Sequence, residues 1–310
     1  MDVWLIPILQ VLVWIVSIGL TSTLLAKATM EIEKKLDSGL TGGLILGLIN
    51  SLPETIIITE AVLSGANEVA VGSITGSLLF IFTFGIGLIS VVYYFRYKSK
   101  TIQIDGDISS EYTSLLIALV TFTLVLLVFR SVNYYASILL LIPYVYYVYR
   151  RYRGRRVDVR REFNVRKTIL LLSIGAVMLF LISNFFVSSL VSLSTVFNIP
   201  TVVLASVLVP IASELGDGFL ALSLLYNSAS NVDTVITNFM GGKLENLTLL
   251  LSIPGFYTTV NLVSNHLDVI LIPLSVLSLL MIIRDKNIKI SEGLALITIY
   301  PILILFLLLR

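Results

Sequence analysis

The sequence predicts an all-α polytopic membrane protein with ten transmembrane helices in two inverted five-helix repeats. Three observations lead to this fold class. Of the 310 residues, 57% are hydrophobic and only 13% are charged, and the mean hydropathy is +0.99. Apolar runs of about twenty residues, the length of a helix that crosses a bilayer, recur along the whole chain. The most basic stretch of the chain divides these runs into two sets of five.

The first predicted repeat comprises residues 1–149. Short polar or charged turns separate its apolar runs, so each run is expected to form one helix. Its predicted spans are 3–26, 41–63, 68–94, 113–129 and 134–149. A group of charged residues beginning at Lys27 is expected to form the turn after the first span.

Residues 150–167 form the predicted linker between the repeats. This stretch carries nine cations: Arg150, Arg151, Arg153, Arg155, Arg156, Arg160, Arg161, Arg166 and Lys167. So much arginine is also typical of nucleic-acid binding. Beside membrane spans, however, such a loop is expected on the cytoplasmic side, in contact with anionic lipid. The expected partners are therefore the lipid bilayer and inorganic cations, and not nucleic acid.

The second predicted repeat comprises residues 168–310, with spans at 168–190, 200–226, 232–251, 269–283 and 294–309. With the linker inside, only Arg130, Lys243 and Arg310 of the 21 lysines and arginines fall outside the linker and the inner loops. Both termini are therefore expected outside, and the expected location is the cell membrane. Five spans per half require the second half to be inverted, which is the architecture of alternating-access transporters.

The second predicted span is interrupted near its middle by a helix breaker and a carboxylate. Residues 50–54 read Asn-Ser-Leu-Pro-Glu. Because proline has no N–H, the carbonyl of Ile49 is expected to lose its helical partner at Pro53. This carbonyl, the small polar side chains and Glu54 together supply hard oxygen ligands for a metal cation. A proline kink with Glu54 facing a pore is the simpler alternative.

A second copy of this feature occurs in the seventh span. Leu215-Gly216-Asp217 aligns with Leu52-Pro53-Glu54 at an offset of 163 residues. Glu214 lies three residues before Asp217, on the same helix face. Glu54, Glu214 and Asp217 are therefore predicted to converge near the midplane. Because like charges cannot all remain ionised in a low dielectric without a cation, the site is expected to bind metal ions, protons or both in competition.

The spans that follow the two broken helices carry a second, weaker repeat. Residues 72–76, Gly-Ser-Ile-Thr-Gly, align with residues 237–241, Thr-Asn-Phe-Met-Gly, at an offset of 165. The small residues are expected to let these helices approach the broken ones closely, and Ser73 and Asn238 offer oxygen atoms at matching positions.

Residues 50–54, followed by Gly-Ser-Ile-Thr-Gly-Ser at 72–77, resemble the first alpha-repeat of the cation/calcium exchanger superfamily of sodium/calcium and proton/calcium antiporters. The resemblance implies ten helices in two inverted halves. It also implies that Glu54 and Asp217 are paired acidic calcium ligands. Neighbouring oxygens are then implied from Asn50, Ser51 and Ser213, and polar positions of the next helices from Ser73 and Asn238. Glu214 departs from the pattern, since the first repeat has Ser51 at that position.

Lys243 is a second departure, because it lies inside the eighth predicted span with Glu245 two residues later. A buried lysine is costly unless it is paired. It therefore either neutralises Glu245, Glu214 or Asp217, or occupies a cation subsite itself. In the latter case the ion stoichiometry would differ from that of a sodium/calcium exchanger.

The functional prediction is a secondary active antiporter, not an enzyme, that exchanges calcium or a similar divalent cation for sodium or protons at the midplane. No cofactor is expected, and the ions are transported substrates. Monovalent sodium/proton exchange is the alternative. A passive channel is also possible, because polar residues at the midplane serve selectivity filters too. A nucleotide-driven pump is not expected, since the chain has no phosphate-binding glycine loop. Leu215–Gly218 also suggests an intramembrane aspartyl protease, but Glu214 stands where its signature requires glycine, and the other aspartates lie in loops or at span ends.

Overall fold

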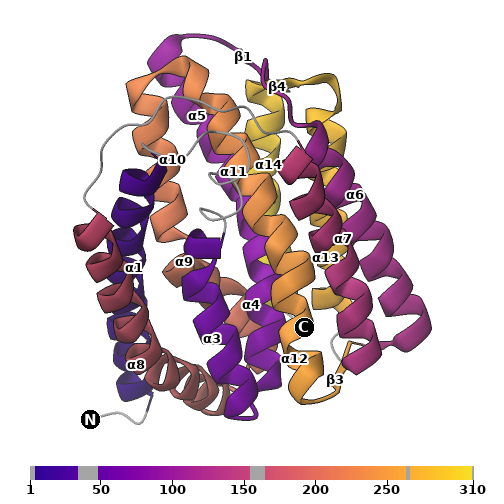
Figure 1. Cartoon of the computed structure of the whole chain (residues 1–310). Helices are drawn as coiled ribbons and strands as arrows, with labels where there is room; N and C mark the ends of the chain where they lie inside the picture. The colour runs from indigo at the N-terminus through magenta and orange to yellow at the C-terminus, as the bar shows by residue number, and fades with distance from the viewer. Residues whose placement is uncertain (1–3, 34–47, 154–164, 263–265, 309–310) are drawn as a thin grey trace.

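The computed structural model describes residues 4–33, 48–153, 165–262 and 266–308, which form a bundle of helices (Figure 1). The first half contains α1 (Leu5–Glu33), α3 (Leu52–Leu63), α4 (Asn67–Leu79), α5 (Ile86–Tyr97), α6 (Ser109–Leu124) and α7 (Tyr134–Arg153). The second contains α8 (Val165–Phe197), α9 (Thr201–Ser213), α10 (Leu215–Asn227), α11 (Val232–Glu245), α12 (Leu251–Tyr257), α13 (His266–Ile282) and α14 (Ile290–Leu308).

The helices have the character of membrane spans. Among the described residues, five helical segments are long and apolar enough to cross a bilayer, or six if α9 and α10, which meet at a 44° bend, form one span. Large apolar side chains cover the outer faces, with Leu127 68% exposed and Phe180 61% exposed. A bilayer is the environment in which such faces are stable. The protein is thus an integral, all-α polytopic membrane protein, whereas the count of ten spans stays a prediction.

Several helices extend beyond the predicted spans. α1 continues to Glu33, so Lys27 lies in a helix and not in a turn. α7 continues to Arg153 and α8 begins at Val165, so both ends of the predicted linker are helical. Residues 154–164 lie outside the described part of the chain. Arginine has a high helix propensity, which is consistent with the extension of α7 through its basic end.

Two π-helical segments interrupt equivalent spans of the two halves. η1 (Phe80–Gly85) joins α4 to α5, and η4 (Asn246–Leu250) joins α11 to α12. The two last residues, Gly85 and Leu250, are separated by the same offset of 165 that relates residues 72–76 to 237–241. Because π-helical turns widen the helix and rotate the following side chains, they often occur at functional sites. A third, η2 (Val125–Phe129), ends α6.

Short strand pairs connect the two halves. β1 (Thr101–Gln103) pairs antiparallel with β4 (Asn287–Lys289), and β2 (Ser131–Val132) pairs with β3 (Val260–Asn261). In each pair one strand comes from each half. The labels of β1 and β4 lie at the top of Figure 1 and that of β3 at the bottom. The halves are thus joined at opposite ends of the bundle, as expected for an inverted arrangement.

Close packing of α4 against α9 fixes the broken helix of the second half. A Cβ atom on Gly72 would lie 2.4 Å from the Val202 carbonyl oxygen, and one on Gly76 would lie 2.0 Å from that of Ser206. Pro210 removes the helical N–H partner of this Ser206 carbonyl. The close approach expected for the third span is therefore confirmed. Gly241 in the eighth span instead faces the Tyr147 hydroxyl.

We expect Gly76→Val to destabilise the protein by about 1–3 kcal/mol or more, because the added side chain overlaps the backbone of α9. The midpoint of thermal unfolding in detergent measures the effect. Gly218→Ala is the matched control, since a Cβ there has no described atom within 4 Å and alanine favours a helix. Equal stabilities of the two variants would contradict the tight α4–α9 contact.

Candidate cation site

The site begins with two backbone breaks at equivalent positions. Residues 48–50 are helical, Ser51 forms a turn, and α3 begins at Leu52. In the second half, Glu214 forms the turn between α9 and α10. Ser51 has φ −78° and ψ −3°, and Glu214 has φ −84° and ψ −5°. Both are right-handed helical conformations, so the chain turns at each break without leaving the helical region.

Each break places an acid in the first turn of the helix that follows. Glu54 is the third residue of α3, and Asp217 is the third residue of α10. Pro53, at the second position of α3, needs no helical N–H there, so the break precedes the proline. The partial positive charge of a helix N-terminus favours a carboxylate at this position.

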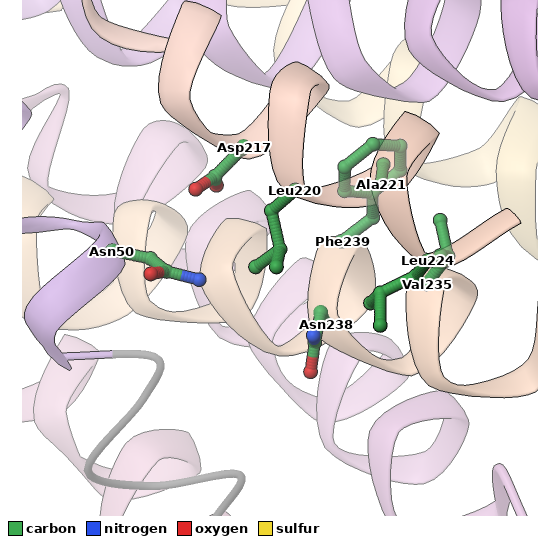
Figure 2. Close-up of a pocket in the computed structure, with 8 residues that line it drawn as sticks. All are labelled: Asn50, Asp217, Leu220, Ala221, Leu224, Val235, Asn238 and Phe239. Carbon is green, nitrogen blue, oxygen red and sulfur yellow. The ribbon is translucent and has the colours of Figure 1, made fainter. Parts of the chain in front are cut away.

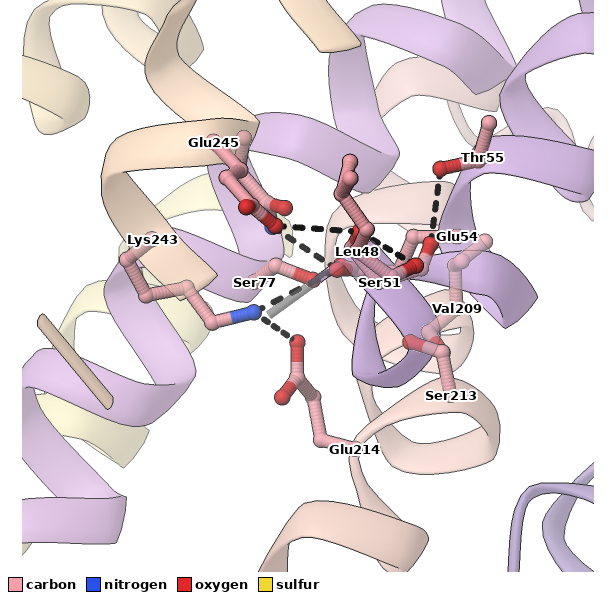
Figure 3. Close-up of polar contacts among 11 residues, drawn as sticks. Leu48, Ser51, Glu54, Thr55, Ser77, Val209, Ser213, Glu214, Lys243 and Glu245 are labelled. Carbon is pink, nitrogen blue, oxygen red and sulfur yellow. Dashed lines mark hydrogen bonds and ion pairs between the residues drawn. The ribbon is translucent and has the colours of Figure 1, made fainter. Parts of the chain in front are cut away.

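Lys243 connects the two halves of the site (Figure 3). Its Nζ donates to Glu214 Oε1 and lies 3.3 Å from Glu54 Oε2. All three side chains are buried, with Lys243 2% exposed, Glu214 3% and Glu54 4%. If all three are ionised, the group carries one excess negative charge. Of the alternatives considered for Lys243, contact with Glu214 is confirmed, and Glu54 is an additional partner.

Two further donors contact Glu54. The hydroxyl of Ser77, on α4, donates to Glu54 Oε1. The amide of Asn246, at the start of η4, donates to Glu54 Oε2 at 2.8 Å. The carboxylate therefore accepts hydrogen bonds from two side chains in addition to its ion pair. Asn246 Oδ1 is buried and has no hydrogen-bond partner among the described residues.

Glu245 contacts the break of the first half. Its Oε2 accepts a hydrogen bond from the Ser51 hydroxyl at 3.2 Å, and its Oε1 lies 3.4 Å from the Tyr144 hydroxyl. The end of α11 thus contacts both breaks, through Glu245 at Ser51 and through Lys243 at Glu214. Glu245 is fully buried, so these hydroxyls partly replace its hydration.

Asp217 faces a pocket beside this network. The pocket is also lined by Asn50 and Asn238, and Figure 2 shows the Asp217 carboxylate and the Asn50 amide directed toward the same space. Asn50 Oδ1 has no hydrogen-bond partner within the described residues. A second pocket shares Asn50 and Asn238 and extends to Arg151, in the last turn of α7. The pockets therefore meet at two amide side chains.

The eight residues predicted as ligands do not form one cluster. Glu54 and Glu214 contact Lys243 and form the Lys243 network with it, and Ser51 contacts Glu245. Asp217, Asn50 and Asn238 instead line the adjoining pocket. Ser213 donates to the Val209 carbonyl in its own helix and lines a pocket with Asp217. Ser73 is fully buried without a partner among the described residues. In the described ranges, no three acidic or histidine side chains are arranged to hold a metal ion.

Four side chains contact predicted ligands although none of the four was predicted as a ligand. Ser77, Lys243 and Asn246 contact Glu54, and Glu245 contacts Ser51. Ser77 lies one helical turn after Ser73 and so shares its face. Asn246 lies eight residues, about two turns, after Asn238. A search for polar residues at one-turn intervals along the predicted spans would have found both.

The network is chemically suited to cations. It concentrates carboxylate oxygens, which are hard ligands, where water is largely excluded. Buried charges require a partner, and Lys243 supplies it between Glu54 and Glu214. When Glu54 and Glu214 are both ionised, the excess charge of this group is negative, and it then attracts a further cation.

The chain is similar in structure to an H+/Ca2+ exchanger, CAX, with a TM-score of 0.82 and 19% identity over 97% of this chain and 82% of that one. YfkE gives a TM-score of 0.78 and 19% identity over 97% and 92% of the two chains. The sodium-calcium exchanger NCX_Mj has a TM-score of 0.67 and 16% sequence identity, over 96% of this chain and 98% of that one.

Comparison with curated proteins gives no match. The model of the family described as sodium/calcium exchanger protein matches residues 6–153 and 167–309, one segment in each half. These segments include both helix breaks and all four acids of the site. The chain therefore belongs to the sodium/calcium exchanger protein family and is an ion-exchanging transporter rather than an enzyme.

Proposed function

We propose that the protein is a secondary active antiporter that exchanges Ca2+, or a similar divalent cation, for Na+ or protons by alternating access. The observation that carries this proposal is the meeting of Glu54 and Glu214 at one buried point, each from a broken helix of a different half. The H+/Ca2+ and sodium-calcium exchange named for the structurally similar CAX and NCX_Mj supports the same choice of ions.

Glu54 and Asp217 are the proposed paired acidic ligands of the transported cation, near the midplane. Both are third residues of half-helices, whose N-terminal ends face the site. Ca2+ takes six to eight oxygen ligands. Neutral oxygens are proposed from Asn50, Ser51, Ser213, Ser73 and Asn238, and Glu214 is proposed as an additional acid.

Alternating access is proposed to occur by movement of the two halves about this site. The β1–β4 and β2–β3 pairs join the halves at two ends of the bundle and leave the middle free of strand pairing among the described residues. We place the basic linker in the cytoplasm and both termini outside, in the cell membrane, because nearly all cations then lie on the inner side. The pocket that reaches Arg151 would then open toward the cytoplasm.

Monovalent Na+/H+ exchange is the second candidate. It is favoured by one observation, the Lys243 ammonium, which leaves the Glu54–Glu214 pair with a single excess negative charge. A singly charged cation would balance that charge. Asp217 favours the divalent alternative, because it adds a further carboxylate beside the pair.

Glu54→Gln is expected to reduce Ca2+ uptake into proteoliposomes to the level of protein-free liposomes, under an outward Na+ or proton gradient. The substitution removes the charge on which the divalent cation depends while keeping the side-chain shape. Glu60→Gln is the matched control. Glu60 lies on the same helix, and its carboxylate contacts Asn184 instead of the Lys243 network. Gradient-coupled uptake by Glu54→Gln equal to that of the parent would contradict the proposal.

Competition between ions separates the two candidate functions. If the site is built for divalent cations, Ca2+ should displace radiolabelled Na+ at a concentration about a hundredfold below that of unlabelled Na+, because two acids bind a doubly charged ion more strongly. Equilibrium binding to the purified protein measures this ratio. Displacement by Ca2+ only at concentrations similar to those of Na+ would favour monovalent exchange.

A further inference from the structure

The side chain of Lys243 occupies the position in which a cation would bridge the two halves. Its Nζ contacts Glu214 and lies 3.3 Å from Glu54. The first acid belongs to the broken helix of the second half and the second acid to that of the first. An ordinary buried lysine needs one acidic partner, whereas this ammonium contacts two carboxylates as a bridging ion would.

Glu54 has no oxygen free of a donor in this arrangement. Ser77 donates to Oε1, and Asn246 and Lys243 both donate to Oε2. A carboxylate has about four lone-pair sites, and these three donors take both sites on Oε2 and one on Oε1. A metal cation can therefore bind Oε2, or both oxygens together, only if a donor withdraws. Of the three donors, Lys243 carries the charge that repels a metal ion. The ammonium and an incoming cation are therefore competitors for the same carboxylate.

The contacts of Lys243 with its two acids are unequal. It lies closer to Glu214 than to Glu54. Lysine has a flexible four-carbon side chain that can release one partner while keeping the other. In the first half, the positions equivalent to Glu214 and Lys243 are Ser51 and Leu78, at offsets of 163 and 165. The acid and the lysine therefore occur together, on one half only.

The geometry points to Lys243 as a tethered cation that is held by Glu214, occupies one cation position at Glu54 and thereby sets the ion affinity and stoichiometry of the site. This inference rests on the proposed function, because it assigns Glu54 to the transported ion, and it differs from that proposal at Glu214, which holds the ammonium instead of the transported ion. A transported cation displaces the ammonium from Glu54 while Glu214 keeps it in the site. Until this displacement occurs, the ammonium takes the place of one solution ion at Glu54.

The double variant Glu214→Gln, Lys243→Met tests the inference. It removes one negative and one positive charge, so the net charge of the site is unchanged, and neutral replacement of a buried ion pair is often tolerated. A tethered competitor at Glu54 predicts that the double variant binds radiolabelled Ca2+ or Na+ at least about tenfold more tightly than the parent. A lysine that merely neutralises Glu214 predicts unchanged affinity.

The single variants and a control complete the experiment. Glu214→Gln alone is expected to weaken cation binding, because Lys243 then has Glu54 as its main partner, and the added Lys243→Met should reverse the loss. Lys100→Met, at an exposed loop residue, is the matched control for loss of a lysine charge and should bind as the parent does. Cation-induced increases in the thermal unfolding midpoint of each purified variant provide a second measure.

The outcomes separate this inference from the proposed function. Tighter Na+ binding by the double variant supports the inference even if the parent fails to exchange Ca2+. Conversely, normal Ca2+ exchange by the parent combined with unchanged or weaker cation binding by a folded double variant overturns the inference and leaves the proposed function intact.

Discussion

The ion pairs of Lys243 with Glu54 and Glu214 are the interaction on which the rest of the site depends. Three buried charged side chains in a membrane protein are stable only when they neutralise one another and accept further hydrogen bonds. The surrounding structure brings them together. The breaks at Ser51 and Glu214 turn the chain, and the close contact of Gly76 with α9 brings α4, which carries Ser77, beside the second broken helix.

The backbone of the two halves is more symmetric than their chemistry. The breaks share nearly the same backbone angles, π-helical segments follow in equivalent spans, and each strand pair takes one strand from each half. The side chains differ, because Lys243, Glu245 and Asn246 correspond to Leu78, Phe80 and Ile81. Inverted symmetry thus provides the scaffold, whereas the charged network comes largely from one span. If the proposed site is correct, ion choice depends mainly on this one span, whose residues a symmetric alignment does not pair with polar partners.

Much of this arrangement could be predicted from the sequence. Proline and glycine mark the broken spans because they weaken helices, and an acid in an apolar segment marks function because its burial is costly. The ligands on the following spans were harder to choose. Ser73 and Ser77 lie on one face, and sequence alone does not state which turn is level with Glu54. The π-helical segment that begins at Asn246 adds a further difficulty. Its wider turn changes which side chains of the helix face the site, and a regular helical spacing does not predict this change.

The retained negative charge of the site explains how a tethered lysine is compatible with obligatory exchange. An antiporter must not change its access side while empty, and an uncompensated buried charge opposes that movement because it lacks hydration. Lys243 balances only one of Glu54 and Glu214, and Asp217 adds another acid nearby. The ammonium therefore lowers the charge of the empty site without cancelling it. Under the proposed function, a bound ion is still needed to complete neutralisation, so a tethered lysine would change how many charges are carried while exchange remains coupled.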